Sequence, residues 1–157
     1  MHRKLTAIAV LAVLVATAAT MATVAAAEPL AAKQRVAIQL KGGASFVLAP
    51  MTSGAVKRDA GSASACCWTR RYVTRDGLTH EIDDPQLTLI GKRGTLVLRN
   101  RIEFFDIFDG WTATTATWKV VRGTGDYAGF SGGGSGAGVE LANGNAKTLF
   151  QGFLSPK

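Results

Sequence analysis

The two cysteines of this 157-residue chain, Cys66 and Cys67, are direct neighbours. Paired cysteines in an exported protein usually form a disulfide. Successive side chains of a strand point to opposite faces, however, so a bond between neighbours needs a distorted turn. Three states stay open: a strained vicinal disulfide that could serve as a redox or ligand-sensing latch, two free thiols with one buried, or bridges between chains. The pattern favours a thiol that faces the core.

A second group that could do chemistry is His80 with the acids Glu81, Asp83 and Asp84. A divalent metal needs several ligands that converge from defined positions. The chain offers no calcium-loop pattern and no second histidine beyond its N-terminal segment. The two aspartates precede Pro85 and are typical of a turn whose carboxylates bind backbone amides. We therefore expect no metal site and no cofactor.

Catalytic signatures are weak in this sequence. A serine triad would have to use His80, and no serine lies in a G-x-S-x-G elbow. No catalytic residue is assigned. An isomerase or cyclase would need an acid or an arginine that points into an apolar cavity, where burial shifts its pKa. Arg99, Arg101 and Glu103, which share one face of a predicted strand, are the groups to test.

The elements that must position these residues are strands. After residue 34, apolar residues recur at every second position, and glycine-containing turns separate the apolar runs. The expected turns are Gly42-Gly43, Asp76-Gly77, Gly91 to Gly94, Asp109-Gly110 and Asn143-Gly144. About eight strands and no helix follow. Antiparallel strands joined in sequence hide their edges by closing into a β-barrel, and a β-sandwich is the alternative.

The predicted strand from Thr95 to Phe105 carries the most informative polar residue. Asn100 interrupts an apolar face, while the opposite face is charged and typical of a solvated side. The apolar face consists of Leu96, Leu98, Ile102 and Phe104. An amide in the wall of a barrel is a candidate ligand contact. We take Asn100, Trp118 and Tyr127 as candidate ligand-binding residues at the lumen or the rim.

The N-terminal residues predict export. Arg3 and Lys4 precede an uncharged Ala/Val/Leu run that ends in Ala25-Ala26-Ala27, which is the layout of a helical signal peptide over residues 1–27. A short linker (28–34) and one barrel domain (35–157) follow, with no transmembrane span after cleavage. We expect a secreted protein that is extracellular or associated with the cell envelope.

The charge of the mature chain is modestly positive. Loss of Arg3 and Lys4 with the signal lowers the formal charge from +7 to about +5. The remaining basic residues are scattered, without a run or a known nucleic-acid motif, so we expect no nucleic-acid partner. Weak attraction to an anionic envelope component fits this charge.

The most specific segment runs from Trp118 to Gly129 and reads WKVVRGTGDYAG. With the glycine-rich stretch that follows it, this segment resembles small secreted bacterial proteins related to the allene oxide cyclase and dirigent barrel group. The likeness extends from about Gly94 to Gly134. It implies an eight-stranded barrel with room for a ligand, and it implies no particular reaction. From the residues alone the glycines form a structural corner, because no helix follows to receive a phosphate.

The leading functional hypothesis is a secreted, non-catalytic β-barrel that binds a small apolar or amphipathic ligand or a cell-envelope partner. The alternative is an isomerase, a cyclase or a dirigent-like protein that acts in the barrel cavity. The two differ in whether an ionisable group faces the cavity.

Overall fold

The structure is a computed structural model that describes residues 32–108 and 110–156, without the side chains of residues 106–108. The expected signal peptide and the linker up to residue 31 lie outside these residues. In the described part of the chain, no helix is long and apolar enough to cross a membrane.

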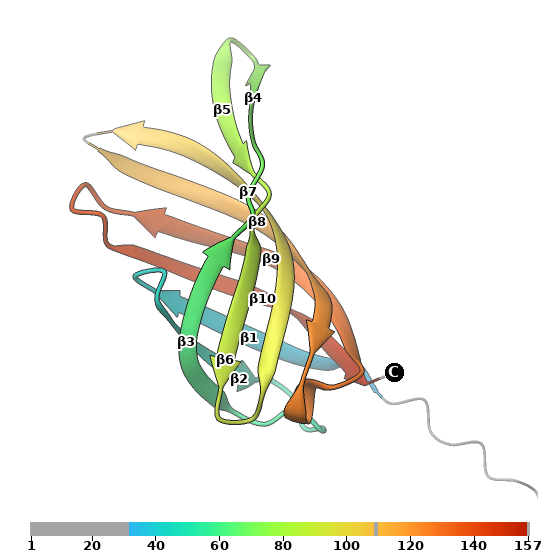
Figure 1. Ribbon diagram of the computed structural model, residues 1–157. Helices are drawn as coiled ribbons and strands as arrows, with labels where there is room; N and C mark the ends of the chain where they lie inside the picture. Colours follow the sequence, from blue (N-terminus) through green and yellow to red (C-terminus); the bar gives the residue numbers. More distant parts are fainter. Residues whose placement is uncertain (1–31, 109, 157) are drawn as a thin grey trace, which may run out of the picture.

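The fold is all-β, with a closed antiparallel barrel of eight strands (Figure 1). The barrel strands are β1 (Gln34–Lys41), β2 (Ser45–Pro50), β3 (Asp59–Cys66), β6 (Gln86–Gly91), β7 (Thr95–Phe108), β8 (Trp111–Gly123), β9 (Phe130–Glu140) and β10 (Ala146–Pro156). They pair in the order β7-β6-β3-β2-β1-β10-β9-β8, and pairing of β7 with β8 closes the barrel. The barrel is thereby confirmed over the sandwich.

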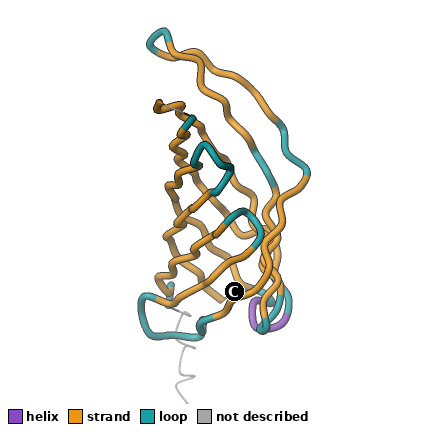
Figure 2. The backbone as a smooth tube through the Cα atoms, turned by 90° about the vertical axis from the view of Figure 1, so that its left-hand side faces the viewer, coloured by secondary structure: helices purple, strands orange, loops and turns teal. Residues whose placement is uncertain are grey.

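Two further strands, β4 (Arg70–Arg75) and β5 (Leu78–Asp83), form a hairpin at one end of the barrel, which we call the flap (Figure 1). β5 pairs with the second half of β7, and β6 pairs with the first half of the same strand. Between β3 and β4 the extended chain is broken at residues 67–69. A second break at Asp84-Pro85 lies beside it, because the amide of Asp84 donates to the carbonyl of Thr69. Figure 2 shows both breaks as loop segments in the long hairpin.

The end of the barrel away from the flap is tied shut by buried polar side chains, and we call it the closed end. Asp59 accepts hydrogen bonds from the backbone amides of Lys92 and Arg93 and, at 2.9 Å, from the Tyr127 hydroxyl. The Gln34 amide group binds the carbonyl and the N–H of Val56. These bonds hold together the 51–58 loop, the turn between β6 and β7 and the turn between β8 and β9.

The corner that leads from β8 to β9 belongs to the closed end. Gly125, at the start of a three-residue 3-10 turn (Gly125–Tyr127), has a φ of +59°, and a Cβ there would lie 2.3 Å from the carbonyl oxygen of Arg93. A larger residue would therefore meet both a strained backbone and a clash. The glycine-rich corner has the structural role that its spacing predicts.

Large side chains fill the half of the barrel next to the closed end. The fully buried residues include Val36, Ile38, Leu48, Leu98, Phe150 and Leu154. β9 makes room for them, because its inward positions are the glycines Gly132, Gly134, Gly136 and Gly138, which face β10 and β8. A Cβ on Gly136 would lie 2.2 Å from Cδ1 of Phe150. The glycine-rich strand is thus the wall against which the aromatic rings pack.

Candidate functional site

The half of the barrel next to the flap contains a cavity of about 180 Å³. Leu40, Leu87, Ile102, Ala116 and Phe150 are among its lining residues. Alanine and threonine occupy several inward positions around this cavity. They leave space, whereas larger residues fill the corresponding space near the closed end. The barrel interior is therefore solid at one end and hollow at the other.

Asn100 lies in the wall of this cavity. The side chain is 3% exposed, and its Oδ1 is the one buried side-chain oxygen or nitrogen of the described residues without a hydrogen-bond partner. Its backbone N–H donates to the carbonyl of Pro85. A buried acceptor left without a donor costs about 1–3 kcal/mol. The sequence places Asn100 at the lumen or the rim, and in the structure it lies in the lumen wall with its acceptor free.

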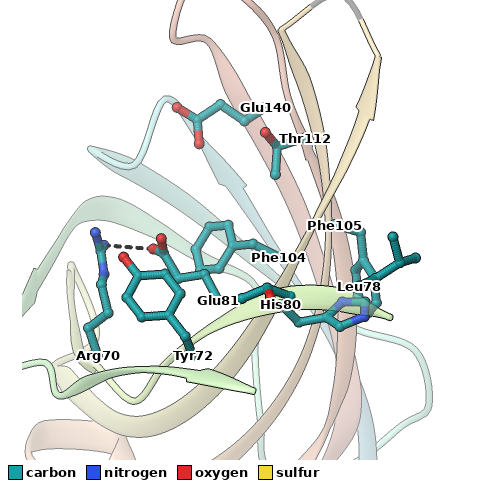
Figure 3. Close-up of a pocket in the computed structure, with 10 residues that line it drawn as sticks. Arg70, Tyr72, Leu78, His80, Glu81, Phe104, Phe105, Thr112 and Glu140 are labelled. Atoms are coloured by element: carbon teal, nitrogen blue, oxygen red, sulfur yellow. Dashed lines mark ion pairs between the residues drawn. The ribbon is translucent and has the colours of Figure 1, made fainter. Parts of the chain in front are cut away.

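A larger space of about 740 Å³ lies above this cavity, between the flap and the barrel rim, and we call it the mouth. Its lining includes Arg70, Tyr72 and Glu81 of the flap (Figure 3). Phe104 and Glu140 line both the mouth and the inner cavity, so the two spaces adjoin at these residues. The cross-strand register explains the flap lining, since Tyr72 lies opposite Glu81 and Glu81 opposite Phe104, on the face that continues into the lumen.

Arg70 holds the acids of the flap together. Its Nε and Nη2 donate to the two carboxylate oxygens of buried Asp83 at 2.9 Å each, and Nη2 also lies 2.9 Å from Glu81 (Figure 3). The hydrogen bond with Asp83 is the main reason why the pKa of Arg70 is raised, and the charges of Asp83 and Glu81 add to it. Arg70 stays charged, so these acids are neutralised in place.

His80 also lines the mouth, but it lies on the other face of β5 from Glu81. His80 packs edge-on against Phe105, with ring centroids 5.0 Å apart, and Glu103 pairs with Arg75 at 3.0 Å. Figure 3 shows His80 and Phe105 apart from Arg70 and Tyr72. Strand alternation thus separates His80 from Glu81. No group of three or more metal-ligating side chains occurs among residues 32–108 and 110–156.

The acids before Pro85 are arranged differently from the expected turn. Their carboxylates bind arginines of β4 rather than backbone amides: Asp83 binds Arg70, and Asp84 binds Arg71. The reason is the flap register, which places Arg70 opposite Asp83. Sequence distance gave no signal of this pairing, because each arginine lies 13 positions before its acid.

The other two ligand candidates lie elsewhere. Trp118 is buried in the core and donates from Nε1 to the carbonyl of Gln151, and Tyr127 is buried at the closed end on Asp59. Neither lines the mouth or the cavity. Arg99 and Arg101 are exposed on the outer face, and Glu103, partly buried, pairs with Arg75 there. None of these three charged groups lines either space.

The ionisable side chains that line the mouth include Arg70, His80, Glu81 and Glu140. Sequence patterns single out His80 and Glu81 only as possible metal ligands, and they do not single out Arg70 or Glu140. Side chains alternate between the two faces of the hairpin around Asp76-Gly77. This alternation would have placed Arg70 and Glu81 on the inward face if the pairing of the flap with β7 had been known.

Both cysteines are exposed free thiols, so the expectation that one of them faces the core is wrong. Cys66 ends β3 on the outer face, and Cys67 has a φ of +58° that interrupts the strand.

Comparison of the chain with protein-family models, with curated proteins and with solved structures finds no match. The site is therefore interpreted from its own geometry.

Proposed function

We propose that this protein is a secreted, non-catalytic β-barrel that binds a small amphipathic ligand, with the apolar part in the inner cavity and the polar part in the mouth. The observation that carries the proposal is the free, buried Oδ1 of Asn100 in the cavity wall. A ligand hydroxyl or N–H that donates to this oxygen would remove the cost of burying it. The likeness to the allene oxide cyclase and dirigent barrel group agrees with a ligand cavity.

The size of the inner cavity limits the part of the ligand that enters it. An apolar cavity of about 150 Å³ is large enough for benzene. The space of about 180 Å³ here therefore suits one substituted six-membered ring or a short branched chain. The mouth, with Arg70, Tyr72, Glu81 and Glu140 on its walls, would take a polar extension of the ligand.

The probe pair that tests the proposal is p-cresol and toluene, which differ by one hydroxyl. We expect p-cresol to bind about 3- to 10-fold more tightly, since a hydrogen bond to Asn100 contributes about 0.5–1.5 kcal/mol. Titration calorimetry and NMR shifts of the ring protons measure both affinities. If neither probe binds, the proposed cavity does not take ligands of this class.

Two variants locate the binding. Asn100→Leu should lose the preference for p-cresol and, without ligand, should be more stable to urea by about 1–3 kcal/mol, because the unpaired acceptor is gone. Ala116→Leu, which fills the cavity, should block both probes, whereas Thr117→Leu on the exposed face of the same strand should not. Retention of the p-cresol preference in Asn100→Leu would assign the hydrogen bond to another group.

Glu140 favours the second candidate, an isomerase or cyclase. It lines both spaces, and no lysine or arginine of the described residues forms an ion pair with it, in contrast to Glu81. A carboxylate above an apolar cavity can exchange protons with a bound ring. Deuterium uptake by cyclohexenone in D₂O tests this activity: the wild type should accelerate it and Glu140→Gln should not. Equal uptake with and without the wild-type protein would exclude this chemistry for that probe.

A further inference from the structure

The two cysteines form the most unusual pair of side chains outside the site. In a regular strand, neighbouring side chains point to opposite faces. Here β3 ends at Cys66, and Cys67 adopts a left-handed backbone conformation with a φ of +58°. Both residues are exposed, and the neighbouring Cys67 thiol is the main cause of a raised pKa of Cys66. The backbone break therefore brings together two thiols that strand geometry would keep apart.

The pair lies at the junction between the barrel and the flap. Residues 67–69 connect β3 with β4, and the β4 residue Arg70 binds Asp83 and the mouth residue Glu81. On the neighbouring chain segment, Asp84 donates its N–H to Thr69 and its carboxylate binds Arg71. A change in the backbone at Cys67 would therefore be transmitted to the first residues of β4.

We propose that Cys66 and Cys67 are a reversible oxidation site that forms a vicinal disulfide and thereby changes the course of the chain into the flap. The co-reactant is a low-molecular-weight disulfide. One cysteine thiolate attacks it, which forms a mixed disulfide and releases one small thiol. The second cysteine thiolate then attacks the mixed disulfide and releases the other small thiol. The protein loses two protons and two electrons, and the small disulfide gains them.

The surroundings of the pair favour ring closure over attack by another chain. The second thiol belongs to the next residue of the same chain, so the second step is intramolecular and has a high effective concentration. The neighbouring Cys67 thiol raises the pKa of Cys66 above its ordinary value. Because the thiolate is the reactive form, oxidation should accelerate as the pH rises above neutral.

The intact mass of the folded protein provides the first test. After incubation with oxidised glutathione and then N-ethylmaleimide, we expect the loss of two hydrogen atoms and no added alkyl group. Dithiothreitol should restore two alkylation sites. Two alkyl groups after the oxidant, a persistent glutathione adduct or a disulfide-linked dimer would each overturn the proposal.

Matched variants separate ring closure from ordinary thiol reactivity. Cys66→Ser and Cys67→Ser should each stop at the mixed disulfide with glutathione. Trp68, which follows the pair and is 58% exposed, should report the backbone change as a shift in fluorescence on oxidation. Trp68→Phe should lose that shift while it still forms the bond. Bond formation without any change in Trp68 emission would contradict the structural part of the proposal. Neither readout depends on the proposed ligand.

Discussion

Two buried polar side chains in this barrel have opposite surroundings. Asp59 accepts hydrogen bonds from the amides of Ala60, Lys92 and Arg93 and from the Tyr127 hydroxyl. Asn100 Oδ1 accepts none from the described residues. A satisfied buried carboxylate stabilises the fold, whereas an unsatisfied amide oxygen costs stability until a donor arrives. At the scale of the residue, this contrast separates the structural end of the barrel from the end that we propose binds a ligand.

Tyr127 should make the stability of the protein sensitive to alkaline pH. Burial, then the hydrogen bond to Asp59, raises the pKa of Tyr127 above its ordinary value of 10.0. From about pH 10 upward the unfolded chain ionises this tyrosine while the folded chain keeps it neutral, so stability falls there and is fully present below. The slope should reach about 1.4 kcal/mol per pH unit.

Urea unfolding of the wild type and of Tyr127→Phe between pH 8 and 11 measures this effect. The variant lacks the tyrosine slope, while its lysines still titrate as in the wild type. Near neutral pH the variant should be less stable by about 1.5–3 kcal/mol, because Asp59 loses a hydrogen-bond donor in a buried site. Parallel pH profiles for the two proteins would contradict the assignment.

At the scale of the element, β9 and the flap illustrate two uses of strand alternation. Four successive inward positions of β9, from Gly132 to Gly138, are glycines, so rings from the neighbouring strands occupy the space that side chains of β9 would otherwise fill. In the flap, alternation places Tyr72 and Glu81 on the face that continues into the lumen and His80 on the other face, against Phe105. The same period of two therefore builds a packed wall in one strand and a polar rim in another.

Gly136→Ala should destabilise the barrel although alanine is the smallest possible addition. The new Cβ would lie 2.2 Å from Cδ1 of Phe150 and 2.9 Å from the carbonyl oxygen of Leu149, and Phe150 is 1% exposed. We expect a loss of about 1–3 kcal/mol in the free energy of unfolding, measured with urea. Ser135→Ala, on the exposed face of the same strand, is the control and should change stability little. A neutral Gly136→Ala would show that this wall has room to spare.

At the scale of the whole molecule, the barrel has a filled half and a hollow half. Bonds of Asp59 and Gln34 tie the closed end, and buried aliphatic and aromatic side chains pack above it. The other half holds the cavity that contains Asn100 and opens toward the mouth beside the flap. The filled half provides the stability that the hollow half lacks, since burial of apolar surface and close packing stabilise the folded state.

Substitutions in the two halves should therefore have opposite effects. Leu98→Ala removes a fully buried side chain from the filled half and should lower the free energy of unfolding by about 2–5 kcal/mol. Ala116→Leu adds volume in the hollow half and should change stability by less than about 1.5 kcal/mol, because the cavity accommodates it. Equal losses in the two variants, measured by thermal or urea unfolding, would contradict this division.

The sequence by itself determined the strands, most of the hairpins and the barrel class. These follow from alternation along one strand and from turn pairs such as Asn143-Gly144, which are local properties of the chain. It also placed Asn100 on the inner face. Only the tertiary structure decided that the strand breaks at Cys67, that Arg70 binds Asp83 and Glu81, and that Trp118 and Tyr127 lie away from the cavity. The physical reason is that these features depend on the cross-strand register and on the volumes of side chains from different strands, which meet only when the barrel closes.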